Sequence, residues 1–221
     1  MTRVLIVEDQ ALFAEVIRES LLDLGMDVAP PCVTGAQALE AAPRVKPDVV
    51  LLDIGLPDQN GFIIGREIRR LLPEALVVAL TAMDDVRSVR QAMREGFHGY
   101  LTKDLSVGAF VRSIQNIIEG QVVVPQHASG AMAGGGRRSD DDLLFSRLTQ
   151  REREVLDLLV KGSSGGAIAR RLSVSPHTVR THVQSILVKL QVHSRLEAVA
   201  VAFRRGLETT PPPPWPAGSV A

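Results

Sequence analysis

Five short hydrophobic segments alternate with amphipathic segments over the first 120 residues, and this alternation constrains the fold more than any other feature. The stretches between the strand-like segments have the period of a helix, as in 11–24, where Leu12, Val16, Ile17 and Leu21 would share one face. Alternating strands and helices form a parallel sheet with helices on both faces. We therefore predict an α/β domain with strands at 3–8, 27–33, 48–53, 76–80 and 98–101.

The second predicted strand contains Pro30 and Pro31. Because proline cannot donate a hydrogen bond to a neighbouring strand, this strand should lie at an edge of the sheet. The flavodoxin-like strand order 2-1-3-4-5 places the second strand there. The predicted fold class is thus a flavodoxin-like (βα)5 domain with a 2-1-3-4-5 parallel sheet.

A second, helical domain is predicted after a glycine-rich stretch. Periodicity fails from 121 to 146, which indicates a flexible linker. Segments 149–152 and 194–197 then have the pattern of capping boxes, Ser175-Pro176 places an N-cap before a proline, and 164–172 gives a weaker helix signal. We predict an α/β domain at 1–122, a linker at 123–145, a small four-helix domain at 146–207 and a disordered Pro-rich tail at 208–221.

The zero net charge of the chain conceals an asymmetry between its two parts. Residues 1–130 hold 12 Lys and Arg against 17 Asp and Glu, whereas 145–207 hold 11 against 4. A net charge of +7 on the helical part predicts that this part binds a polyanion.

The chain contains no run of about 18 apolar residues, and its start lacks the long apolar region of a signal peptide. We expect a cytoplasmic protein with no membrane partner. The single cysteine, Cys32, cannot form an internal disulfide and is interpreted as a small apolar core residue.

Polar residues collect where the predicted strands end. Glu8 and Asp9 follow the first strand and Asp53 ends the third, so the order 2-1-3-4-5 brings three carboxylates together. Such a cluster repels itself unless a cation is present, and all-oxygen ligands suit Mg²⁺. Thr81 and Lys103, at the ends of strands four and five, could hold the oxygens of an anion. This arrangement provides what phosphoryl transfer to Asp53 requires, although a lone Asp after a strand is usually a turn or capping residue.

These residues, with the LDIGLPDQNG loop and the GYLTKD segment, resemble the receiver domain of bacterial response regulators over residues 3–120. The resemblance implies that Asp53 accepts a phosphoryl group from a sensor histidine kinase. It also implies a Mg²⁺ site and a second group of residues, which binds the phosphoryl oxygens and changes conformation. The metal site would comprise Asp9, Asp53 and the carbonyl of Gly55, with Glu8 supporting a metal-bound water; the second group would comprise Thr81, Ala82, Lys103 and the aromatic switch Tyr100.

An enzyme is the alternative for this site, because aspartate-nucleophile phosphatases also place Asp and Mg²⁺ at the end of a strand. Those enzymes have a D-x-D pattern, in which the first Asp is the nucleophile. In this chain the position of the second Asp is occupied by Gly55. Neither Gly55 nor Met83, the residues expected to flank the phosphoryl group, can orient a water molecule. We therefore predict a long-lived phosphoaspartate with slow autodephosphorylation, and no turnover enzyme.

The helical part contains a second candidate site. One face of a helix carries Val179, Val183, Ile186, Leu187 and Leu190, and the other face is polar and cationic. Any solvated helix can show this pattern. The preceding short helix, the LSVSP turn and the charge of +7 favour a helix-turn-helix whose second helix enters the major groove.

The segments LTQREREVL and IARRLSVSPHTVRTHVQSILVKL resemble the LuxR-type (NarL/FixJ) DNA-binding domain over residues 146–207. The resemblance implies binding to double-stranded DNA and homodimerisation on activation. Base edges would be read by Arg180, Thr181 and Gln184, and phosphates contacted by Ser175, His177, Thr178 and Lys189. The last helix would form the dimer contact through Leu196, Val199, Ala200 and Phe203, unless this face packs within its own domain.

Two departures from the family pattern affect this domain. The family has a better capped helix start at the positions that Gly165, Gly166 and Ala167 occupy here. This departure predicts a frayed first turn of the helix and weaker, less salt-dependent DNA binding. Gln191 replaces a glycine at the end of the recognition helix, which predicts a C-cap that is strained or differently built.

The two resemblances together predict a two-component response regulator. Phosphorylation of Asp53 would change the surface at 84–119 and release or dimerise the DNA-binding domain. The alternative is a receiver-containing DNA-binding protein that works without phosphate, under the control of dimerisation or a protein partner.

Overall fold

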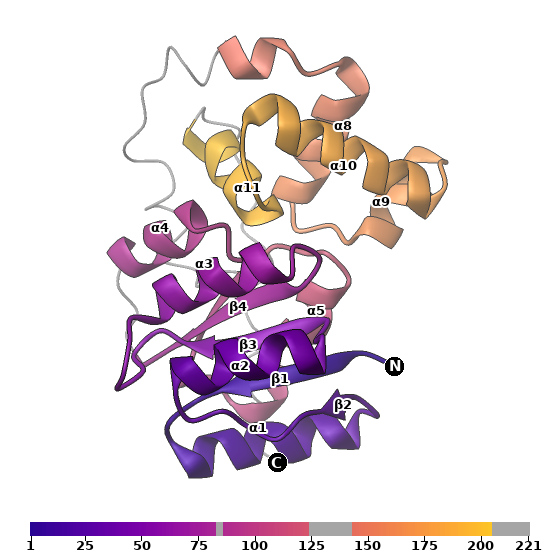
Figure 1. Cartoon of the computed structure of the whole chain (residues 1–221). Coiled ribbons are helices and arrows are strands. Elements are labelled where there is room, and N and C mark those ends of the chain that lie inside the picture. The colour runs from indigo at the N-terminus through magenta and orange to yellow at the C-terminus, as the bar shows by residue number, and fades with distance from the viewer. Residues whose placement is uncertain (83–85, 124–142, 205–221) are drawn as a thin grey trace.

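The computed structural model describes residues 1–82, 86–123 and 143–204. Its N-terminal part contains a five-stranded parallel sheet of order β2-β1-β3-β4-β5 (Figure 1). The predicted α/β fold and the strand order 2-1-3-4-5 are therefore confirmed. The strands are β1 (Arg3–Val7), β2 (Asp27–Val28), β3 (Val49–Asp53), β4 (Leu76–Thr81) and β5 (Gly99–Thr102).

Helices cover both faces of the sheet because alternate residues of each strand point to opposite sides. Leu51 and Leu80 pack with α1 and α5 in one buried cluster, while Leu52 and Ala79 pack with α2, α3 and α4 in another. Both clusters consist almost entirely of aliphatic and aromatic side chains. These helices are α1 (Ala11–Asp23), α2 (Gly35–Val45), α3 (Gly61–Leu71), α4 (Val86–Arg94) and α5 (Val107–Ile118).

The second strand is shorter than predicted. It covers only Asp27–Val28, and pairing with β1 resumes at one isolated bridge between Val7 and Cys32. The interruption coincides with Pro30 and Pro31, which have no N–H to donate. Cys32 itself is buried in the core, as expected.

The predicted apolar face of α1 was partly wrong. Ile17 and Leu21 are buried together with Ala14, but Leu12 is 81% exposed and Val16 is 41% exposed. Leu12 and Val16 therefore belong to a second apolar stripe on α1, which the core does not cover.

The C-terminal part is helical, as predicted, with α8 (Gln150–Val160), α9 (Gly165–Leu172), α10 (Pro176–Leu190) and α11 (Arg195–Arg204). Thr149 and Glu152 form a complete capping box at the start of α8. The box expected at α11 is only half made: Ser194 Oγ accepts from Glu197 N, but the Glu197 carboxylate accepts from His193 N instead of Ser194 N.

The two parts contact each other through α11, which lies against α4 in Figure 1. Leu196 and Ala200 of α11 belong to the same buried cluster as the side chains beneath α3 and α4. Within the parts of the chain that the structure describes, three hydrogen bonds to backbone carbonyls are seen across this interface. They are Arg195 Nη1 to Gly120 O (2.7 Å), Arg69 Nη2 to His193 O (3.4 Å) and Gly165 N to Glu119 O (3.3 Å).

Most of the predicted linker and tail lies outside the described residues, namely 124–142 and 205–221. At one end of the predicted linker, Val123 forms a bridge to Gly99 and extends the sheet edge. At its other end, Phe145 is buried in the core of the helical part. No helix in the described parts of the chain is long and apolar enough to span a membrane.

Candidate functional site

The strand ends place the predicted acidic site at one edge of the sheet. Asp53 and Thr81 are the last residues of β3 and β4, and Lys103 directly follows β5. Hydrogen bonds between neighbouring strands continue to this edge of the sheet, because Lys103 N donates to Thr81 O at 2.8 Å and Ile54 N donates to Leu80 O at 3.0 Å. The parallel register thus brings the polar side chains together, as expected.

The carboxylate of Asp53 is held by one donor at each oxygen. Oδ1 accepts from Gly55 N and Oδ2 from Lys103 Nζ, both at 2.8 Å, and the residue is only 4% exposed. Gly61 must be glycine here, because a Cβ at this position would collide with the backbone of Asp53 and Ile54. The loop after β3 therefore returns close enough to fix the orientation of Asp53.

Glu8 is completely buried beside Asp53. Its Oε1 accepts from Lys103 Nζ at 2.8 Å and from Gln10 N at 3.0 Å. Its Oε2 lies 2.7 Å from the same ammonium but outside hydrogen-bonding geometry, and it has no hydrogen-bond partner in the described structure. Burial raises the pKa of Glu8, against the opposing effect of its hydrogen bond from Lys103.

Lys103 is the cation of this site, and its side chain is 10% exposed. Burial alone would lower its pKa, but the hydrogen bonds to Asp53 and Glu8 outweigh that effect, so the pKa is raised. The ammonium also lies 5.3 Å from the centroid of the Phe13 ring. Lys103 is therefore a charged, enclosed donor beside the two carboxylates.

The donor set fits a divalent metal ion. Glu8, Asp9 and Asp53 each offer a carboxylate oxygen, and these three atoms lie within 4.8 Å of one another. Three carboxylates and the Lys103 ammonium leave a local charge of −2, which a divalent cation would neutralise. Glu8 Oε2 accepts no hydrogen bond in the described structure, although it lies 2.7 Å from the Lys103 ammonium. Oxygen ligands of this kind are those that Mg²⁺ prefers.

The remaining predicted residues of this site lie around it. Thr81 is 3% exposed, Ala82 is exposed, and Gly55 contributes the N–H that binds Asp53. Tyr100 is fully buried, so its ring is already inside the protein in this structure. Met83 lies outside the described residues.

The second candidate site is the exposed face of α10. Val179, Val183, Ile186 and Leu190 are buried, and Leu187 is half-buried. Ser175 caps the helix by accepting from Thr178 N at 3.0 Å. Five of the seven predicted DNA contacts are exposed: Ser175, His177, Arg180, Thr181 and Gln184.

The other two predicted DNA contacts have partners within the protein. The hydroxyl of Thr178 lies 2.8 Å from that of Ser175. Lys189 Nζ donates to both oxygens of Glu152, at 2.8 and 2.7 Å, so the structure pairs it with a carboxylate where we predicted a phosphate contact. The physical reason is that Glu152 is only 4% exposed, and a buried carboxylate requires a partner.

The two departures from the family pattern have different outcomes. The first turn of α9 is formed from Gly165 onward, with Ser164 Oγ accepting from Ala167 N at 3.2 Å, so the predicted fraying is absent from this structure. Gln191 ends α10 in the left-handed region at φ 56°, which agrees with the predicted strain.

The predicted dimer face of α11 is buried within the chain. Leu196 and Ala200 pack in the cluster beneath α3 and α4, whereas Val199 packs in the core of the helical part. Phe203 is half-buried and contacts both clusters. In this arrangement most of the predicted DNA contacts on α10 are exposed, while the predicted dimer contact is covered.

Two family models match the chain, and each covers one of its parts. Residues 4–115 match the response regulator receiver domain, and residues 146–202 match the bacterial regulatory proteins of the luxR family. The chain belongs to the NarL/FixJ family of two-component response regulators. This family regulates transcription through a receiver domain and a LuxR-type DNA-binding domain.

Two bacterial relatives align with nearly the whole chain. The transcriptional regulatory protein LnrK of Bacillus subtilis is 32% identical over 94% of this chain and 99% of its own. The probable transcriptional regulatory protein NarL of Mycobacterium tuberculosis is 36% identical over 93% and 95%. Among solved structures, RcsB of Salmonella enterica serovar Typhimurium, bound to the promoter rprA in the presence of the phosphomimetic BeF3⁻, shares the fold with a TM-score of 0.55, at 20% identity over 92% of this chain and 99% of that one.

Three residues that surround these sites were not predicted. Phe13 lies beside the Lys103 ammonium, and Arg69 and Arg195 bind carbonyls across the interface between the two parts. The spacing of Phe13, four residues after Asp9 at the start of a predicted helix, was the only available signal for any of them.

Proposed function

We propose that Asp53 accepts a phosphoryl group from a sensor histidine kinase in the presence of Mg²⁺, and that this event controls dimerisation and sequence-specific binding to double-stranded DNA. The observation that carries the proposal is the buried Asp53 carboxylate, held by Lys103 beside the oxygens of Glu8 and Asp9. We also propose the division into a receiver at 1–122, a linker, a DNA-binding domain at 146–207 and a tail.

The side chains present can carry out the transfer. One Asp53 oxygen forms a bond to phosphorus as the bond between phosphorus and the kinase histidine nitrogen breaks. Lys103, with the Thr81 hydroxyl and the Ala82 N–H, would donate to the phosphoryl oxygens. Asp9, Asp53 and the Gly55 carbonyl would hold Mg²⁺, with Glu8 behind them, and the ion would neutralise the charge that gathers during transfer.

Phosphorylation of Asp53 would be coupled to DNA binding through the α4 side of the receiver. Tyr100, Leu196 and Ala200 belong to one buried cluster, so a rearrangement near Tyr100 changes the surface on which α11 rests. The candidate dimer contact is covered there, while Arg180, Thr181 and Gln184 are not. We therefore propose that phosphorylation frees α11 for dimerisation and does not uncover α10.

The DNA-binding proposal rests on the exposed cationic face of α10 and on the excess of basic residues in this part of the chain. It is supported by the RcsB structure, in which a protein of the same fold is bound to a promoter. Arg180 could pair with guanine and Gln184 with adenine, as these side chain types commonly do.

Incubation with a small phosphodonor and Mg²⁺ tests the proposal. Intact mass analysis should show one phosphoryl group on the wild-type protein and on the control Asp104→Asn, in which an exposed carboxylate near the site is removed, but none on Asp53→Asn. Phosphorylation should also shift the protein towards a dimer and tighten DNA binding. If the label is acquired but oligomeric state and DNA affinity do not change, the phosphate-independent alternative is correct.

A further inference from the structure

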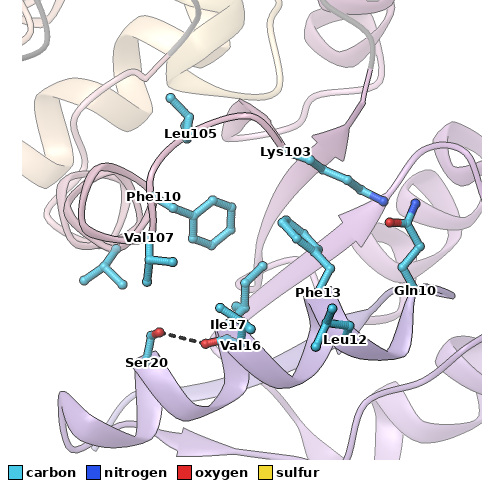
Figure 2. A pocket seen from close by; sticks show the side chains of 11 residues that line it. Gln10, Leu12, Phe13, Val16, Ile17, Ser20, Lys103, Leu105, Val107 and Phe110 are labelled. Carbon is cyan, nitrogen blue, oxygen red and sulfur yellow. Dashed lines mark hydrogen bonds between the residues drawn. The ribbon is translucent and has the colours of Figure 1, made fainter. Parts of the chain in front are cut away.

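A groove lies between α1 and α5, as Figure 2 shows, and Lys103 of the acidic site is among the residues that line it. It has a volume of about 410 Å³, and its walls are mainly apolar side chains of α1 and α5. Lys103 and Gln10 lie at the end nearest the carboxylates. The exposed second stripe of α1, which includes Leu12 and Val16, forms part of this groove.

Phe13 occupies the boundary between the groove and the acidic site. The centroid of its ring lies 5.3 Å from Lys103 Nζ, within the range of a cation–π contact. The same ring meets Phe110 of α5 edge-to-face, with centroids 6.3 Å apart and an interplanar angle of 81°. Two helices therefore fix the position of the ring that faces the ammonium.

Among the described residues, the carboxylates of Glu8 and Asp53 are the other groups that hold the Lys103 ammonium. Its recorded hydrogen bonds go to Glu8 and Asp53, and Asp53 is the group that changes when a phosphoryl is transferred. Because the lysine stem has four rotatable bonds, loss of the Asp53 contact would leave Glu8 as the one carboxylate that restrains the ammonium. The negative face of the Phe13 ring supplies an attraction that does not change during transfer.

We propose that Phe13 is a positioning residue for phosphoryl transfer to Asp53. Its ring keeps the Lys103 ammonium close to the strand ends. The ammonium can then exchange the Asp53 carboxylate for the incoming phosphoryl oxygens while the lysine side chain keeps its conformation. The inference rests on the proposed function of Asp53 and adds a residue of α1 to the machinery.

A purely structural role is the competing explanation, since Phe13 also packs α1 against α5 through Phe110. Fluorine substitution separates the two roles. Fluorine atoms on the ring withdraw electron density and weaken the cation–π attraction, while ring size and packing change little. Phe110 provides a matched control, because it shares the ring pair but takes no part in the recorded contact with Lys103.

The experiment replaces Phe13, and separately Phe110, with 4-fluoro-, 3,5-difluoro- and 3,4,5-trifluorophenylalanine in the full chain. The readout is the maximal rate at which saturating acetyl phosphate with Mg²⁺ labels Asp53. We expect the rate to fall stepwise along the Phe13 series, by about three- to tenfold at the end, and to stay constant along the Phe110 series. Phe13→Tyr should retain the wild-type rate within about twofold, because the tyrosine face also attracts cations.

A wild-type protein that takes no label would overturn the proposed function and this inference with it. A wild-type protein that is labelled, combined with a flat Phe13 series or with equal decreases along both series, would leave the proposed function intact and overturn the role of Phe13.

Discussion

The guanidinium of Arg195 donates a hydrogen bond to the carbonyl oxygen of Gly120 at 2.7 Å, and so ties the start of α11 to the second residue after α5. Gly120 has a φ of +82°, and a Cβ at this position would collide with the Arg195 guanidinium. Glycine suits this position because of its backbone conformation and because it leaves room for the Arg195 guanidinium where that group bonds the Gly120 carbonyl.

Gly120→Ala should separate the two domains, whereas Gly25→Ala should not. Both glycines have a left-handed backbone conformation, so each substitution by alanine costs about 1–2 kcal/mol of backbone strain. A Cβ on Gly25 meets no atom within 4 Å, and only the Gly120 variant displaces Arg195. Small-angle scattering should show a larger radius of gyration for Gly120→Ala alone. Equal radii for the two variants would mean that this contact does not hold the domains together.

Lys189→Met should destabilise the DNA-binding domain by about 2 kcal/mol, because it removes the cationic partner of the buried Glu152 carboxylate and leaves it with the hydrogen bond from Thr149 N. Lys161→Met removes an exposed pair with Asp157 and should cost about 0.5 kcal/mol. Urea denaturation at pH 7 measures both. Similar losses in the two variants would show that Glu152 does not depend on Lys189.

The Glu152 contribution should also depend on pH. Burial tends to raise the pKa of Glu152, but Lys189 and Thr149 together hold it below its ordinary value of 4.5. The folded state thus binds this proton less tightly than the unfolded state, so the stabilisation is present above pH 4.5 and fades as the pH falls through the lowered pKa. The difference between wild type and Lys189→Met should shrink in acid, and a difference that is constant down to pH 3 would contradict this expectation.

His98 should make the receiver sensitive to mild acid. Burial, with smaller contributions from the charges of Arg69 and Arg195, lowers the pKa of His98 from 6.5 to about 4. The unfolded chain takes up this proton first, so stability falls as the pH drops from 6.5 towards 4. Between pH 7 and pH 5 the loss should be about 2 kcal/mol.

His98→Asn is the matching variant, because the asparagine oxygen can accept from Val77 N as His98 Nδ1 does at 3.1 Å. It should lose most of the extra acid sensitivity between pH 7 and pH 5. If His98→Asn and the wild type show the same pH dependence of unfolding, another group is responsible.

The fold and the acidic site could be predicted because they follow from local rules. Strand and helix periods define the sheet, and a parallel sheet must bring its strand ends, and hence Glu8, Asp53 and Lys103, to one edge. The β2 strand was overestimated because Pro30 and Pro31 interrupt pairing inside an otherwise apolar segment.

Other features could not be predicted, for physical reasons. Helix α1 has two apolar stripes, and periodicity alone does not say that Ile17 is buried while Leu12 is not. The interface between the domains contains hydrogen bonds to the backbone carbonyls of Gly120 and His193. The pattern of side chains along a sequence does not reveal bonds of this kind. The partner of Lys189 is 37 residues away in the sequence, and nothing in a single sequence distinguishes it from a phosphate.

The central claim is that modification of Asp53 releases α11 from α4. Its most direct test is the distance between spin labels at Gln91 on α4 and Lys161 in the DNA-binding domain, two exposed positions, in a Cys32→Ala background. Pulsed EPR should show one short distance in the resting protein and a longer, broader distribution after addition of Mg²⁺ and beryllofluoride, with no change in Asp53→Asn. A wild-type distribution that stays short when beryllofluoride is bound would contradict the account.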